Sequence, residues 1–274
     1  MAISRERRGV PRPTAGGVEA SGAGAPTSSS LSSPSTCGVR ATLLARVLRS
    51  GAVGLLALAL GGCDTLVQGN GVYFEEVRED VGPFVGLRVE DGIQATVTAQ
   101  TAAQRVLVSG DANVVRIIRT EVEVRAGRPV LHVFIQETFE RTIPPAVVVE
   151  VPSFEYVSAT QGSRIRVGNA GTDIFTVVAD QGSAVQLLGK DDVDPAGETI
   201  EVELASGAVL DATRYPVSAT ASVALSGASA AKLHSDGPVT GTVANASRLE
   251  NLYGTGHCAL VSKDDTSTVS CPAP

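Results

Sequence analysis

The chain has 274 residues, of which 43% are hydrophobic, 19% are charged and only 4% are aromatic. The first 62 residues carry 7 basic and 2 acidic residues, whereas the remainder carries 15 basic and 27 acidic residues, a net charge of −12. An acidic body repels phosphate backbones, which argues against nucleic-acid binding. Because aliphatic side chains supply the bulk, we expect thin, regularly stacked layers.

The N-terminal quarter has the composition of a leader rather than of a folded domain. Residues 1–38 are rich in Ala, Gly, Ser and Pro, so we predict a disordered or untranslated extension. Residues 39–62 contain three arginines, an apolar run and then small residues, the pattern of a secretory signal peptide. The apolar run is too short to span a bilayer, which needs about 20 residues.

The end of this signal resembles a bacterial lipobox, with Leu60-Gly61-Gly62 directly before Cys63. In such signals the peptidase cuts between Gly62 and Cys63, after the cysteine sulfur has received a lipid. Two or more acyl chains anchor a protein stably to a membrane. The resemblance therefore implies a lipid-anchored protein of the bacterial cell envelope that faces the periplasm or the cell surface. The outer membrane is favoured, and Asp64 keeps the inner membrane open.

The body begins, on this interpretation, with a tether over residues 63–75, followed by one domain over residues 76–274. Short β-branched segments bounded by Gly, Asp or Pro predict strands. A helical spacing of Val114, Ile117 and Ile118 predicts a short helical turn near residues 112–119. The predicted strands are residues 84–89, 93–100, 104–110, 129–136 and 146–151.

From residue 157 onward the sequence becomes repetitive, as in QGSRIRV at 161–167 and QGSAVQL at 181–187. Alternation of small or aliphatic with polar residues follows each repeat, inside a period of about 20 residues. We therefore predict an all-β fold, a parallel β-helix or β-solenoid with coils of about 20 residues, in which small residues stack as a ladder. The predicted positions of this ladder of small residues, which we call the serine column, are Ser163, Ser183, Ser206, Ser229 and Ser247.

The order of these segments resembles the bacterial family called putative auto-transporter adhesin, head GIN domain. Gly92-Ile93-Gln94 stands at the place of the family's Gly-Ile-Asn turn, with Gln for Asn. Val151-Pro152-Ser153-Phe154 matches its Val-Pro-Ser strand, and the QGS repeats match its serial corners. The resemblance covers roughly residues 72–255. It implies a β-helical domain on exported, often lipid-anchored proteins, and it supplies no catalytic residues.

The acidic segment 190–203 offers a weak calcium candidate. Asp192, Asp194 and Glu203 occupy positions 1, 3 and 12 of an EF-hand-like frame, although Ala196 replaces the ligand at position 5. A solvated acidic loop is the preferred interpretation, so we predict no metal and no cofactor.

Two cysteines near the C-terminus, Cys258 and Cys271, are candidates for a disulfide, because an exported chain meets an oxidising compartment. A zinc site at His257 and Cys258 lacks the paired ligand spacing of such sites.

A non-enzymatic envelope protein with a surface for adhesion to an unknown protein or polysaccharide is the leading functional hypothesis. A serine hydrolase is disfavoured because the serines recur and no G-x-S-x-G elbow is present. Two alternatives remain: a carbohydrate-active β-helix enzyme, which a cleft with converging carboxylates would indicate, and an envelope-stress accessory protein acting on a membrane partner.

Overall fold

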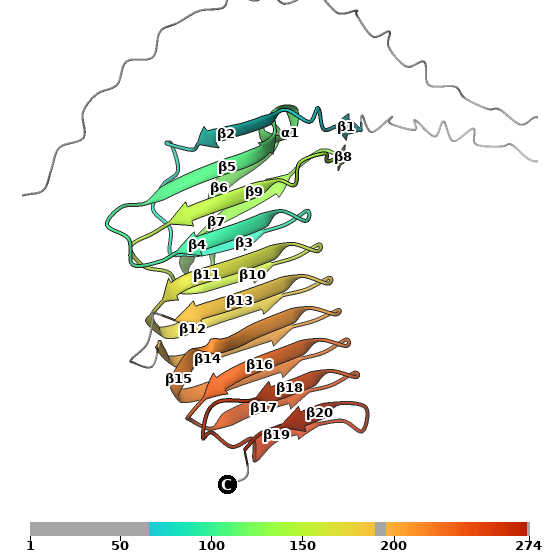
Figure 1. Ribbon diagram of the computed structural model, residues 1–274. Coiled ribbons are helices and arrows are strands. Elements are labelled where there is room, and N and C mark those ends of the chain that lie inside the picture. Colours follow the sequence, from blue (N-terminus) through green and yellow to red (C-terminus); the bar gives the residue numbers. More distant parts are fainter. Residues whose placement is uncertain (1–65, 190–195, 273–274) are drawn as a thin grey trace, which may run out of the picture. The chain divides into compact units, whose positions relative to one another are not determined.

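The computed structural model describes residues 66–189 and 196–272. These residues form an all-β structure with one short helix, α1 (Ala112–Val115), which confirms the predicted class. Eighteen strands belong to one strongly curled hydrogen-bonded sheet (Figure 1). β1 (Val67–Gln68) pairs with β8 (Phe139–Glu140) in a separate two-stranded sheet.

The sheet contains two long series of neighbouring strands, which we call the first and the second ladder. In the first ladder, parallel pairing runs from β9 to β20, and β2 and β5 add to its beginning in antiparallel fashion. The first ladder consists, in spatial order, of β2 (Tyr73–Val77), β5 (Arg105–Asp111), β9 (Ala146–Glu150), β4 (Gln94–Thr98), β11 (Arg164–Ala170), β13 (Ala184–Gly189), the first part of β15 (Val209–Leu225), β16 (Ala230–Ser235), β18 (Arg248–Asn251) and β20 (Thr268–Ser270).

The second ladder begins with one antiparallel pair and continues in parallel. Its strands are β6 (Ile118–Arg125), β7 (Arg128–Ile135), β3 (Gly86–Val89), β10 (Tyr156–Ala159), β12 (Thr172–Ala179), β14 (Gly197–Leu204), the second part of β15, β17 (Val239–Val243) and β19 (Leu260–Lys263). From β10 onward the chain alternates between the ladders, and each strand pairs with one from the next repeat (Figure 1).

Tight turns connect the second ladder to the first, and their backbone explains the QGS motif. Gln161 and Gly162 both have positive φ, at 54° and 74°, and Gln181 and Gly182 repeat this at 53° and 70°. Two consecutive residues with positive φ favour glycine at one of them. The residue after each pair, Ser163 or Ser183, directly precedes a strand and is buried. The motif is therefore a left-handed corner followed by a buried position.

The core lies between the two ladders and consists mainly of Val, Leu, Ile and Ala. Its largest side chains form a stack across repeats, with ring centroids 5.9 Å apart for Phe154 and Phe175 and 5.7 Å apart for Phe175 and Tyr215. All three rings are buried. These three aromatic residues are thus stacked from one repeat to the next, as thin layers require.

The beginning of the described structure departs from the prediction of a tether. β1 and most of β2 lie before residue 76, and β2 forms a five-residue antiparallel pairing with β5. The predicted strands appear as β3, β4, β5, β7 and β9. The helical turn is confirmed at α1 but ends earlier than predicted, because Ile118 already begins β6.

Candidate functional site

The outward side of the first ladder presents two parallel rows of side chains from β4 to β18. We call these twelve positions the basic face. Register pairs each residue with its counterpart on the next strand. One row is Gln94, Arg164, Ala184, Val209, Ala230 and Arg248. The other row is Thr96, Arg166, Gln186, Asp211, Lys232 and Glu250.

The basic face is cationic although the body is acidic, with four basic and two acidic side chains. Arg164, Arg166 and Lys232 are exposed, and within residues 66–189 and 196–272 their side chains form no hydrogen bond or ion pair. Arg248 pairs with Glu250, whose side chain is buried although it belongs to the outward row. The Asp211 carboxylate accepts hydrogen bonds from the backbone N–H and the hydroxyl of Thr213, two residues further along the chain. Three cations are therefore available to an anionic ligand.

The second ladder has a different outward surface in its middle portion. Glu201 and Glu203 line a shallow hollow of about 190 Å³ on β14, together with Thr176, Val178 and Ser222. The Thr176 hydroxyl donates to Glu201 at 3.2 Å. Both carboxylates come from one strand, and no acid faces them from the neighbouring strands that line the hollow. This arrangement lacks the opposed acid pair on which many glycosidases depend.

Four serines of the predicted serine column have a structural role, because they are buried and their backbone groups join successive repeats. Ser163, Ser183, Ser229 and Ser247 are at most 1% exposed, and the amides of successive repeats bond to the carbonyls of this column. The prediction for Ser206 was wrong: Ser206 is exposed, has a φ of 49° and occupies the turn. Ala208 takes the column position, since the Val209 and Ala230 amides bond to the Ser183 and Ala208 carbonyls. Ser267, which the sequence analysis missed, continues the column.

The hydrogen bonds of the serine hydroxyls differ between the two halves of the serine column. The Ser229 and Ser247 hydroxyls donate to the carbonyls of Ser226 and Ala244 at 2.6 Å and 2.7 Å. The Ser247 hydroxyl oxygen also lies 3.3 Å from the Ser229 amide. By contrast, the buried Ser163 and Ser183 hydroxyls have no partner among the described residues. No described histidine bonds to any of these hydroxyls, so the column offers no activated nucleophile.

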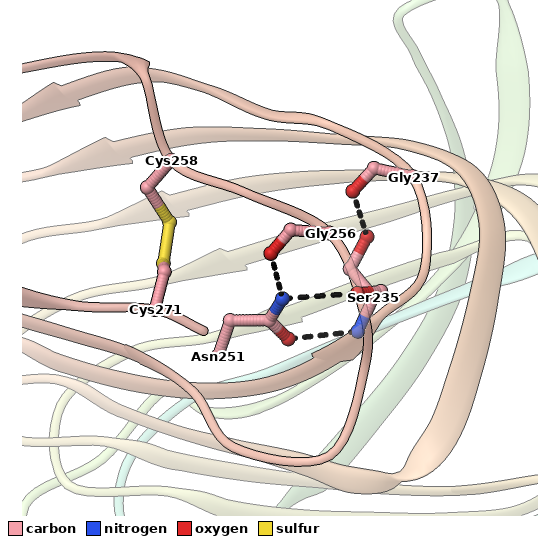
Figure 2. Close-up of a disulfide and its surroundings, with 6 residues drawn as sticks. All are labelled: Ser235, Gly237, Asn251, Gly256, Cys258 and Cys271. Carbon is pink, nitrogen blue, oxygen red and sulfur yellow. Dashed lines mark hydrogen bonds between the residues drawn. A yellow bond between two sulfur atoms is a disulfide. The ribbon is translucent and has the colours of Figure 1, made fainter. Parts of the chain in front are cut away.

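The C-terminal end is closed by a disulfide between Cys258 and Cys271, as the sequence predicts, with Cα atoms 6.0 Å apart (Figure 2). Cys258 packs against the core, as Val261 and Val269 do. Beside it, the Asn251 amide group donates to the Ser235 and Gly256 carbonyls and accepts the Ser235 N–H (Figure 2). The disulfide thus lies at an end of the core where, among the described residues, β19 and β20 each pair with one strand only.

A polar cluster on β3, β6 and β7 was missed by the sequence analysis. His132 lies 3.2 Å from Glu90 and 3.6 Å from Glu121, measured from its ring nitrogens, and its ring stacks on Phe134. Arg88 pairs with Glu90 and, at 3.4 Å, with Glu123. The sequence signal for it is a single histidine, His132, inside an otherwise apolar run over residues 130–135. The charged groups of the cluster lie within ion-pair distance of one another, although the buried Glu90 Oε1 and His132 Nε2 form no hydrogen bond among the described residues.

Asp111 is a second polar centre that the sequence analysis missed. Its carboxylate is fully buried and accepts the backbone N–H groups of Gly71, Thr142 and Ile143 at 2.7–2.9 Å. Burial acts to raise the pKa of Asp111, but these three donors outweigh it, and the pKa lies below its usual value. Asp111 therefore joins the segment between β1 and β2 to the segment after β8.

The remaining predicted site residues are only partly covered. Gly62, Cys63, Asp192 and Asp194 lie outside the described residues. Glu203 is exposed on β14. Within the described ranges, no group of three or more His, Cys, Asp or Glu side chains is placed to hold a metal ion. In the same ranges, no helix has the length and apolarity needed to cross a membrane.

Together, the fold and the site define an all-β protein with an extended, side-chain-lined outer face. The model of one family, described as putative auto-transporter adhesin, head GIN domain, matches residues 83–254. The chain belongs to this family, which confirms the resemblance seen in the sequence. No curated protein matches the chain.

Among solved structures, the chain is similar to a "putative adhesin" of Bacteroides fragilis, with 13% identity and a TM-score of 0.46 over 75% of this chain and 100% of that chain. It is also similar to a "putative adhesin" of Parabacteroides merdae, with 13% identity and a TM-score of 0.41 over 76% and 99% of the two chains. A "putative lipid binding protein" of Parabacteroides distasonis shares 9% identity, with a TM-score of 0.42 over 76% and 100%.

Proposed function

We propose that this protein is a non-enzymatic, lipid-anchored component of the bacterial cell envelope, and that its described domain is a β-solenoid whose flat outer face binds a partner. The observation that carries the proposal is the basic face, where small side chains and three cations without a partner among the described residues stand in register on neighbouring strands. Side chains displayed in this way suit recognition of an extended partner. Membership of an adhesin family supports a location in the envelope or at the cell surface.

The arrangement of polar groups supports binding rather than catalysis. Within the described residues, no hydrogen bond joins the four buried serines of the predicted serine column to a histidine or a carboxylate. No acid on the strands that line the hollow opposes Glu201 and Glu203. Catalysis by a β-helix enzyme would need acid and base groups that converge on one point.

Binding is tested in the native bacterium by proximity labelling with the full chain. The variant R164E/R166E reverses both charges on β11, and R116E/R119E makes the same change at exposed positions away from the basic face. We expect a set of envelope molecules to be labelled by wild type and by R116E/R119E but not by R164E/R166E. Identical labelling by all three proteins would contradict the assignment of the basic face.

Anchoring is tested separately, through Cys63. We expect metabolic incorporation of palmitate into the wild-type chain and none into Cys63→Ser. Incorporation that persists in Cys63→Ser, or its absence from wild type, would contradict the anchor without affecting the binding result.

A further inference from the structure

We propose that the basic face binds an acidic polysaccharide, whose axis runs across the strands from β11 to β18. This inference rests on the proposed function and names the chemical class of its ligand. It follows from the spacing of the cations, from the groups around them and from the absence of a free strand edge on this face.

The spacing of the cations favours a polymer with repeated charges over a small anion. Arg164 and Arg166 stand two residues apart on β11. Lys232 lies three strands from Arg166 in the same row, through Gln186 and Asp211. With neighbouring strands about 4.8 Å apart, this separation is about 14 Å. Arg248, which is already paired with Glu250, lies four strands from Arg164, at about 19 Å. One small anion cannot contact all of these positions.

The groups around the cations suit a ligand rich in hydroxyls. Gln186 lies between Arg166 and Lys232, and Gln94 and Thr96 lie on the strand before β11. These three side chains carry amide or hydroxyl groups and form no hydrogen bond within the described part of the chain. Such groups can donate to and accept from sugar hydroxyls. Ala184 and Ala230 keep the intervening surface low, so that an extended chain can lie flat along it.

An acidic peptide fits this face less well. Extended peptides gain affinity mainly by adding a strand to an open sheet edge, where backbone groups are free. From β4 to β18 each strand of the first ladder is paired on both sides, so its backbone groups are already used. Recognition must therefore use side chains, for which carboxylates and hydroxyls along a sugar chain are suitable partners.

The twelve positions of the basic face include no aromatic residue. The face therefore has no ring on which a sugar could stack, and most of the affinity must come from exposed charges. Such interactions are screened by salt over about 10 Å at 0.1 M. We accordingly expect weak binding that decreases steeply with ionic strength.

The experiment uses the purified full chain and three probes at low salt, by biolayer interferometry. The probes are polygalacturonate as an acidic polysaccharide, dextran as a neutral one and polyglutamate as an acidic peptide. We expect binding to polygalacturonate, at least roughly tenfold weaker binding to the other two probes, and loss of binding near 0.5 M salt. R164Q/R166Q should weaken polygalacturonate binding about fivefold or more, and R116Q/R119Q by less than about twofold.

Each other outcome overturns the inference. Failure of polygalacturonate to bind at low salt removes the ligand class but leaves the partner found by proximity labelling standing. Equal binding of polyglutamate indicates an acidic peptide. Equal losses in the two double variants indicate general attraction rather than this face. A dimer that dissociates in R164Q/R166Q indicates that a second copy occupies the face. Near-ultraviolet circular dichroism of each variant establishes that it is folded.

Discussion

The part of the domain before residue 156 and the part after it are held together in different ways. Before residue 156, antiparallel strands β2, β5 and β6 are added to parallel ones, and single polar groups such as Asp111 fix the crossing segments. After residue 156, parallel strands repeat with the same left-handed corners and small inward residues. The first part therefore depends on individual contacts, and the second on close and regular spacing of its backbone.

The largest expected effect comes from breaking that spacing. Gly241 on β17 has a φ of 122°, and a Cβ there would lie 1.9 Å from the Val223 carbonyl oxygen. We expect Gly241→Ala to cost at least about 5 kcal/mol of unfolding free energy, measured by urea denaturation. Gly162→Ala is the matched control, because its φ is also positive but its Cβ would meet no atom within 4 Å. Equal losses in the two variants would show that φ alone matters.

The next largest loss of stability is expected in the part before residue 156, which we call the irregular part. Asp111→Ala leaves three backbone donors without their acceptor, and we expect a loss of about 4 kcal/mol. Hydrogen exchange should show faster exchange at Gly71, Thr142 and Ile143 than in the repeats. Uniform acceleration over the whole domain would contradict a separate role for this region.

Lowering the pH should cause part of the same loss of stability in the wild-type protein, because it protonates Asp111. The lowered pKa of Asp111 means that its ionised form stabilises the folded state above the unfolded value, about 3.9. That contribution is lost as pH falls through the folded-state pKa. We expect the urea midpoint of wild type to fall more steeply below about pH 4 than that of Asp111→Ala. Parallel pH curves would rule out this linkage.

A smaller loss of about 3 kcal/mol is expected when the disulfide at the end of the repeats is removed in Cys258→Ser/Cys271→Ser. Adding a reductant to wild type should lower its thermal midpoint to that of the double variant and leave the double variant unchanged. A reductant effect of the same size on both proteins would contradict the assignment.

The smallest effect distinguishes two serines of one column. Ser247→Ala removes a hydroxyl that donates to Ala244 and accepts from Ser229, and should cost about 1 kcal/mol. Ser183→Ala removes a buried hydroxyl without a described partner, and should be neutral or slightly stabilising. Urea midpoints measure both, and a larger loss for Ser183→Ala would indicate a partner for its hydroxyl.

The sequence predicts the repeats better than the irregular part, for a physical reason. Side-chain alternation and left-handed corners are local, so the QGS motifs directly reveal β11 and β13. The error at Ser206 arose because the corner Ser206-Gly207 places its serine before the glycine, which moves the inward position to Ala208. The role of Asp111 could not be predicted, because its donors lie about 40 residues before and about 30 residues after it. The basic face could not be predicted fully either. It depends on which residues of successive repeats lie side by side, and the spacing of the repeats in the sequence gives this only imprecisely.

The rows of the basic face have one further consequence. Each strand of the basic face contributes two outward positions, so a bound polymer would meet a series of weak contacts at regular intervals. The strength of the whole would then depend on valency, since linked weak contacts reinforce one another. Gain or loss of a repeat would change that valency without remodelling any single contact, which gives this architecture a simple means of adjusting how firmly it holds a long ligand.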